Sequence, residues 1–164
     1  MESTAAVIPE EPQQPASATQ VAPYKSPFRT SNRPQPEAVR NYLKSLLASD
    51  PYNRFCVECH QKLSTHVIIT LGLFMCKECA AIVQTHLLPM HSRIKDIFGE
   101  HWDDYQLRCV NSAPEIQGGN KHFFEFMREY KLVDESGWVV PEKRYKHESI
   151  RYYARRLWAR VDEH

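Results

Sequence analysis

Apolar positions recur at helical spacing just after the proline at position 36. Within residues 36–49 (PEAVRNYLKSLLAS) they form one stripe, made of Val39, Tyr42, Leu43, Leu46 and Leu47. Intervals of three and four residues place side chains on one face of an α-helix. Proline is also favoured near a helix start. The pattern predicts an amphipathic helix here, ended by the turn-forming sequence SDPYNRF at 49–55.

The middle of the chain changes to a β-strand pattern and then returns to helices. Residues 66–76 (HVIITLGLFMC) are rich in β-branched side chains and predict two short strands bent at Gly72. Residues 77–88 (KECAAIVQTHLL) predict a helix that ends near Pro89. Two further helices are expected within residues 99–111 and 118–130, the second entered from a Gly-Gly pair. No internal repeat is visible.

The last segment, residues 142–163, has the most regular periodicity of the chain. Its apolar stripe consists of Ile150, Tyr153, Ala154, Leu157, Trp158 and Val161. The other face is basic, with seven Lys or Arg against four acidic residues between Glu142 and His164. We interpret it as a solvated helix face. Peripheral contact with acidic lipid headgroups is the alternative, which the four acids weaken.

Residues 1–36 differ in composition from the rest. They contain seven of the eleven prolines and no glycine, together with many Ala, Ser, Thr and Gln. Such a segment buries too little apolar surface to offset the entropy lost on ordering. We expect an extended, Pro-rich tail that binds a partner, followed by one folded domain over residues 37–164.

Length, composition and charge exclude several classes of protein. The 164 residues suit one domain plus a tail, and a hydrophobic content of 42% is enough for a core. A net charge of +1 gives little attraction for nucleic acid, so none is expected as a partner. No run of about 18 apolar residues predicts a transmembrane segment. Neither a signal peptide nor an Arg-rich mitochondrial presequence is expected at the start.

Four of the five cysteines form two close pairs. Cys56 and Cys59 are separated by two residues, as are Cys76 and Cys79, and sixteen residues lie between the pairs. This spacing is typical of a tetrahedral four-sulfur zinc site. A closed four-thiolate shell leaves no position for water, so a single Zn²⁺ would be structural. Two disulfides, four buried thiols and an iron–sulfur centre are the alternatives to zinc.

The other candidate residues point to no catalytic chemistry. Four histidines lie near the cysteines but are not expected to be further ligands, because the shell is already full: His60, His66, His86 and His91. Cys109 is expected to be a small buried hydrophobe. No Ser–His–Asp set, phosphate-binding glycine loop or paired-carboxylate site is visible.

These motifs together resemble the zinc-finger domain of Arf GTPase-activating proteins over residues 37–164. The similar segments are NRFCVEC (53–59), LGLFMCKEC (71–79), WDDYQLRCV (102–110), GGNKHFFEFM (118–127) and EKRYKHESIRYYARRL (142–157). The QLRC and GGN sequences favour the coatomer-associated branch. The resemblance implies an α+β fold, a small four-cysteine zinc finger with short β-strands surrounded by helices. It also implies an Arf-type GTPase as partner.

The resemblance further implies an arginine finger, which such proteins supply in trans to the bound GTPase. An arginine there neutralises charge developing on the transferred phosphoryl group and is worth roughly 10³–10⁵ in rate. The matching position, five residues after the last zinc cysteine, is Gln84. A neutral amide provides no positive guanidinium fork.

Other departures from the family fall on the same surface. The family tryptophan between the cysteine pairs is matched by His66. Five further positions near Gln84 also differ, namely Ala80, Ala81, Val83, His86 and Leu87. Arg93 and Lys95 are the candidate substitutes for the finger, but both lie at least two helical turns further along the chain, so neither is expected to replace it. The scaffold positions are kept, which predicts an intact fold with a rewritten catalytic face.

The sequence therefore predicts a non-catalytic, zinc-binding accessory subunit that contacts protein partners through its tail and domain surface. An active activator of an Arf-type GTPase in vesicle trafficking is the alternative, and a zinc-finger nucleic-acid binder is the third. The resemblance implies a cytoplasmic location. A subunit of an organellar complex, for example a mitochondrial one without a cleavable presequence, is the alternative.

Overall fold

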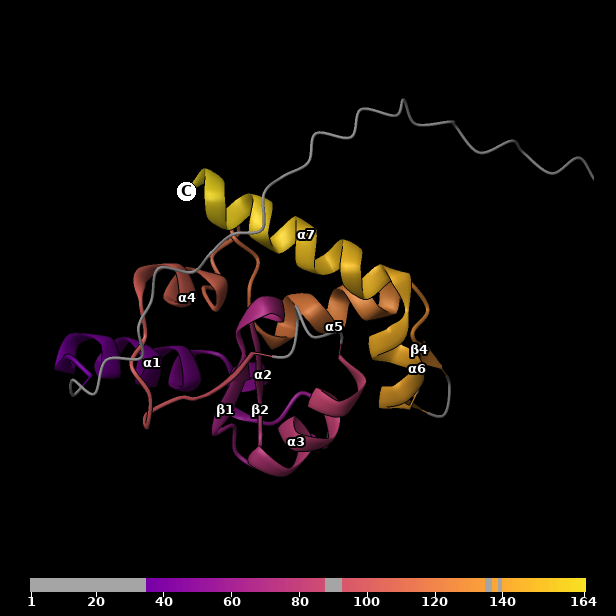
Figure 1. The fold of residues 1–164 in the computed structure, drawn as a ribbon, viewed down its shortest axis with the longest axis horizontal. Helices are drawn as coiled ribbons and strands as arrows, with labels where there is room; N and C mark the ends of the chain where they lie inside the picture. Colours follow the sequence, from indigo (N-terminus) through magenta and orange to yellow (C-terminus); the bar gives the residue numbers. More distant parts are fainter. Residues whose placement is uncertain (1–34, 88–92, 135–136, 139) are drawn as a thin grey trace, which may run out of the picture.

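The computed structural model describes residues 35–87, 93–134, 137–138 and 140–164, so most of the predicted tail lies outside the described residues. Helices and short strands follow one another along the chain as in Figure 1: α1 (Glu37–Ser49), α2 (Pro51–Arg54), β1 (His66–Ile68), the 3₁₀ turn η1 (Ile69–Leu71), β2 (Leu73–Met75), α3 (Lys77–His86), β3 (Ile94–Asp96), α4 (Asp104–Cys109), α5 (Asn120–Glu129), β4 (Val133–Asp134), β5 (Gly137–Trp138), α6 (Pro141–Lys146) and α7 (Glu148–Glu163). The expected α+β class is confirmed.

A three-stranded antiparallel sheet lies at the centre, in the order β2-β1-β3. The predicted bend at Gly72 is confirmed, with the 3₁₀ turn η1 between β1 and β2. Gly72 has φ +62°, and a Cβ there would lie 2.3 Å from the carbonyl oxygen of Cys109. Both the left-handed backbone and this close approach require glycine. The third strand, β3, gave no period-2 pattern in the sequence because it is only three residues long.

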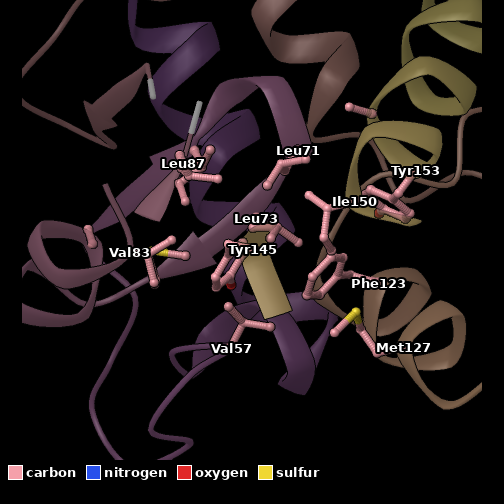
Figure 2. Close-up of a cluster of buried hydrophobic side chains, with 14 of the residues drawn as sticks. Val57, Leu71, Leu73, Val83, Leu87, Phe123, Met127, Tyr145, Ile150 and Tyr153 are labelled. Carbon is pink, nitrogen blue, oxygen red and sulfur yellow. The ribbon is translucent and has the colours of Figure 1, made fainter. Parts of the chain in front are cut away.

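Helices surround the sheet, with α7 along one side of the molecule and α3 on the opposite side (Figure 1). The stripe predicted for α1 is confirmed, because Leu43 and Leu46 are buried. One buried cluster joins the cysteine region to α5 and α7 through residues such as Leu73, Phe123 and Tyr153 (Figure 2). A second cluster contains Trp102 and packs α1 and α4 against the other side of the sheet.

The structure of the last segment differs from the sequence prediction in two respects. Residues 142–163 form two helices, α6 and α7, that are separated at His147. The ring Nδ1 of His147 accepts from the backbone N–H of Ser149 and caps α7. The predicted apolar stripe of α7 is confirmed. The basic residues are not all solvated, however, because the side chain of Arg144 is fully buried.

Candidate metal centre

The four paired cysteines meet at one point of the fold. Cys56 and Cys59 lie in the loop after α2, while Cys76 caps the start of α3 and Cys79 lies in its first turn. Their sulfur atoms all lie within 4.8 Å of one another. Because β1, η1 and β2 form a hairpin-like return, a separation of sixteen residues in sequence becomes a direct contact in space. The predicted grouping of these four cysteines is confirmed.

The sulfur geometry fits zinc. Bonds of about 2.3 Å in a tetrahedral shell give sulfur–sulfur edges of roughly 3.8 Å, which four atoms within 4.8 Å satisfy. All five cysteines are free thiols, so the two-disulfide alternative is wrong. The backbone N–H groups of Glu58 and Cys79 donate to the sulfurs of Cys56 and Cys76, at 3.4 and 3.5 Å. These donors stabilise thiolates.

The electrostatics of the site also favour a cation. Burial raises the pKa of Cys56 to about 11. At Cys59 burial has the same effect, but the backbone N–H groups of Lys62 and Gln61 outweigh it and lower the pKa to about 7. Without a cation, four thiolates in this volume would repel one another. A bound dication stabilises all four in the charged form, and so metal binding contributes to folding.

The histidines do not join the sulfur cluster, which contains only the four cysteines among the described residues. His60 is exposed on the surface, while His66 and His86 are half-buried on β1 and α3. His91 lies outside the described residues. Cys109 is buried in the second hydrophobic cluster, as its sequence context predicted.

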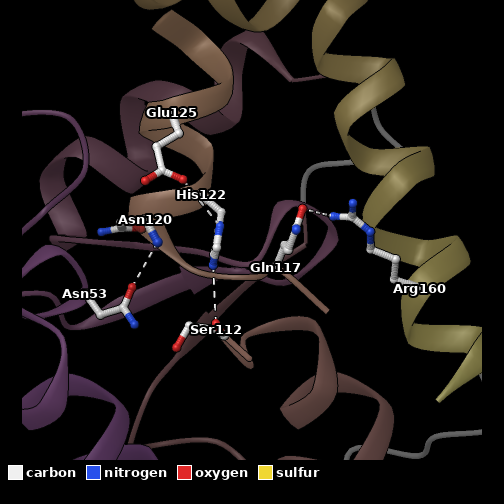
Figure 3. A network of polar contacts seen from close by, with 7 residues as sticks. All are labelled: Asn53, Ser112, Gln117, Asn120, His122, Glu125 and Arg160. Atoms are coloured by element: carbon white, nitrogen blue, oxygen red, sulfur yellow. Dashed lines mark hydrogen bonds and ion pairs between the residues drawn. The ribbon is translucent and has the colours of Figure 1, made fainter. Parts of the chain in front are cut away.

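The Gly-Gly-Asn turn before α5 positions the first cysteine pair. The side chain of Asn120 accepts from the backbone N–H of Phe74 at 2.8 Å. It also donates to the carbonyl oxygens of Tyr52, Phe55 and Phe74, at 2.8, 3.1 and 2.9 Å. Its own backbone N–H donates to the Asn53 side chain at 2.9 Å (Figure 3). One buried amide thus connects α2, β2 and α5 next to the metal centre.

Sequence reasoning missed a buried ion pair beside the metal. Glu58, between the first two cysteines, bonds to the guanidinium of Arg144 and to the hydroxyl of Tyr145. Arg144 is fully buried, and the side chain of Glu58 is 9% exposed. Burial is also the main reason that the pKa of Tyr145 lies well above its usual value. The only sign of this ion pair in the sequence was the acidic residue between the first two cysteines. Its position in the sequence does not show that it contacts α6.

The exposed face of α3 carries no charge in its second half. Helix α3 packs against β1 and α6 through its buried residues Ala80 and Val83. The outward side chains there are Ala81, Ile82, Gln84 and Thr85, all exposed, with Ile82 exposed by 55%. The structure therefore places Gln84 on the outer surface of the helix that follows the last cysteine.

The two basic residues weighed as substitutes lie after α3 and have different surroundings. Lys95 is 5% exposed, bonds to the carbonyl oxygen of His101 and to Gln106, and lies over the Trp102 ring. These contacts hold the Lys95 side chain in the interior of the fold. Arg93 is exposed at the start of β3. Of the two, only Arg93 has a side chain on the surface.

The sequence and the fold have counterparts in known proteins. The sequence profile of ArfGap, described as "Putative GTPase activating protein for Arf", matches residues 40–162. The chain belongs to the ArfGap family. Among solved structures it resembles a "putative GTPase activating protein for ADP ribosylation factor" from Cryptosporidium parvum, with a TM-score of 0.60 and 16% identity over 77% of this chain and 94% of that one. The ArfGap domain of HIV-1 Rev binding protein is 22% identical over 76% and 89% of the two chains, with a TM-score of 0.49.

Family membership determines the cofactor and the general kind of partner. ArfGap domains bind zinc through four cysteines, and here those are Cys56, Cys59, Cys76 and Cys79. The family acts on Arf-type GTPases, so such a GTPase is the partner that membership implies. Assignment to the coatomer-associated branch stays a prediction. None of the described helices is long and apolar enough to cross a membrane.

Proposed function

We propose that this ArfGap domain is a non-catalytic protein-binding module with a structural zinc. The proposal rests on Gln84, which is exposed on α3 and which the sequence resemblance matches to the family's arginine finger. Stabilising the charge on a transferred phosphoryl group needs a cation, and a neutral amide supplies none. The neighbouring outward side chains Ala81, Ile82 and Thr85 supply none either.

The exposed apolar side chain of Ile82 is better suited to contact with a protein partner than to catalysis, which supports the proposal. The Pro-rich tail, residues 1–36, would add a second point of contact. Such a domain would act as an accessory subunit of a larger assembly. We place it in the cytoplasm because of its family, with an organellar complex as the alternative.

Single-turnover GTP hydrolysis by an Arf-type GTPase tests the loss of activity. The GTPase is loaded with GTP and mixed with the full chain or with its Gln84→Ala variant. We expect both mixtures to hydrolyse GTP at the intrinsic rate of the GTPase. A large acceleration by the full chain that is lost in Gln84→Ala would refute the proposal, because Gln84 would then act catalytically.

Family membership itself favours the second candidate, an active GTPase activator with a different cation. Of the two substitutes considered, Lys95 is buried and held by Gln106, which leaves Arg93. In that case the full chain accelerates hydrolysis, Gln84→Ala keeps the acceleration and Arg93→Ala loses it. The same assay therefore separates the two functions.

A further inference from the structure

A groove between α5 and α7 contains an arrangement of charges that the proposed function does not use. Its volume is about 230 Å³. Tyr153, Arg156 and Arg160 line it from α7, and Glu125 and Glu129 line it from α5. In Figure 1, α7 lies on the opposite side of the molecule from α3, with α5 between them, and no residue of α3 lines the groove. The groove is thus separate from the surface that carries Gln84.

The two arginines of the groove have no acidic partner in the described part of the chain, where neither forms an ion pair. Both are held in place by other contacts. The guanidinium of Arg156 lies 5.9 Å from the centre of the Tyr152 ring, and that of Arg160 donates to the side chain of Gln117 (Figure 3). Partial burial, and then the charge of Arg156, lower the pKa of Arg160. The pair therefore places two guanidinium groups on one wall of the groove without a direct ion pair to either.

A buried hydroxyl adds a hydrogen-bond donor to the same wall. Tyr153 is 6% exposed, and its hydroxyl has no hydrogen-bond partner among the described residues. A buried polar group without a partner is destabilising, so such groups in native proteins call for an explanation. An oxyanion bound by the two arginines would accept a hydrogen bond from the Tyr153 hydroxyl.

The opposite wall offers acceptors instead of donors. Glu125 lies 3.6 Å from the ring of His122, while Glu129 follows one helical turn later on α5. Carboxylates there repel a simple anion but accept hydrogen bonds from hydroxyl groups. A ligand that satisfies both walls needs an oxyanion at one end and hydroxyl groups at the other.

We propose that the groove between α5 and α7 binds a hydroxyl-bearing phosphate monoester, with Arg156 and Arg160 on the phosphate and Glu125 and Glu129 on the hydroxyl groups. Guanidinium groups suit the tetrahedral phosphate because each can donate two parallel bonds. A soluble polyol phosphate and an inositol phosphate headgroup of a lipid share this chemistry. The proposal does not depend on whether α3 is catalytic.

Titration of the full zinc-loaded chain with myo-inositol monophosphate, followed by NMR chemical shifts, tests the site. The variant Arg156→Gln/Arg160→Gln should bind at least about tenfold more weakly, as expected for the loss of charge-assisted bonds. The matched control is Arg151→Gln/Arg155→Gln, which removes two exposed arginines of the same helix outside the groove and should bind within about twofold of the wild type. Equal weakening in both pairs would show diffuse charge attraction and overturn the proposal.

A second, milder variant controls for the possibility that the double variant misfolds. Tyr153→Phe removes only the unpaired hydroxyl, so it should leave the fold intact and weaken binding several-fold. Unchanged binding in both Tyr153→Phe and the groove double variant would overturn the site, as would no binding by the wild type. Inorganic phosphate alone should bind more weakly than the monoester because it offers nothing suited to Glu125 and Glu129.

Vesicles of phosphatidylcholine containing phosphatidylinositol 4-phosphate distinguish the two sources of the ligand. Sedimentation with these vesicles, abolished by free myo-inositol monophosphate, identifies a lipid headgroup. Binding of the free monoester without sedimentation identifies a soluble phosphate. Vesicle binding that persists in Arg156→Gln/Arg160→Gln would contradict the assignment to the groove.

Discussion

At the scale of single residues, two amides have opposite roles. Gln84 is exposed on α3, where a change of side chain alters surface chemistry and leaves the core untouched. Asn120 is 2% exposed, and its side chain satisfies backbone groups of Tyr52, Phe55 and Phe74 at once. We therefore expect a change at the first position to leave the fold intact, and a change at the second to disturb the residues next to the metal centre.

Replacing Asn120 by alanine should lower the free energy of unfolding by roughly 3 kcal/mol or more, because several buried backbone groups lose their partner. Urea unfolding of the zinc-loaded chain measures the change. The control is Asn111→Ala, which removes one bond, from the Ala113 backbone N–H at 2.9 Å, and should lose about 1 kcal/mol. Equal losses in the two variants would contradict the role assigned to Asn120.

At the scale of elements, local patterns predicted most helices and failed where a distant contact decides the structure. The stripe in residues 36–49 and the bend at Gly72 follow from neighbouring residues alone. The break at His147 was missed because periodicity continues across it. The bond that caps α7, from the Ser149 backbone N–H to His147, is local, but the helical periodicity masks it. The burial of Arg144 against Glu58, in contrast, depends on residues that meet only in the folded chain.

The contact between α6 and the first cysteine pair gives a second prediction. Arg144→Met leaves the carboxylate of Glu58 buried without its cation, which should destabilise the fold by roughly 3–5 kcal/mol. The exposed neighbour Lys143→Met should change stability by less than about 0.5 kcal/mol. Adding Glu58→Gln to Arg144→Met should recover part of the loss, since the uncompensated charge is removed. Thermal unfolding of the four chains measures these differences, and no recovery in the double variant would contradict the ion-pair explanation.

At the scale of the whole molecule, the zinc site belongs to the hydrophobic core. Cys56 and Cys76 are buried in the same cluster as Phe123 and Tyr153 from α5 and α7. The sequence predicted the four ligands because their spacing is short and specific. It did not show the groove between α5 and α7, since Gln117 and Arg160 come together only through the packing of the two helices.

Removal of zinc should therefore unfold the domain and not only loosen one loop. Chelation is expected to abolish the near-ultraviolet circular dichroism of the buried aromatic residues, and Zn²⁺ should restore it. Zinc content should also fall as the pH is lowered, because protons compete for the thiolates. Cys76→Ser should lose the metal, while Cys109→Ala, which changes a buried cysteine outside the cluster, should keep it. Retained native structure in the metal-free chain would be inconsistent with this role.

The most direct test of the central claim, a retained ArfGap fold without arginine-finger catalysis, is single-turnover GTP hydrolysis by an Arf-type GTPase over a range of concentrations of the full chain. The account predicts the intrinsic rate at every concentration, for the wild type and also for Gln84→Arg, because the neighbouring positions on α3 differ from the family as well. A rise of roughly 10³-fold or more with the wild-type chain, the scale of an arginine finger, would contradict it.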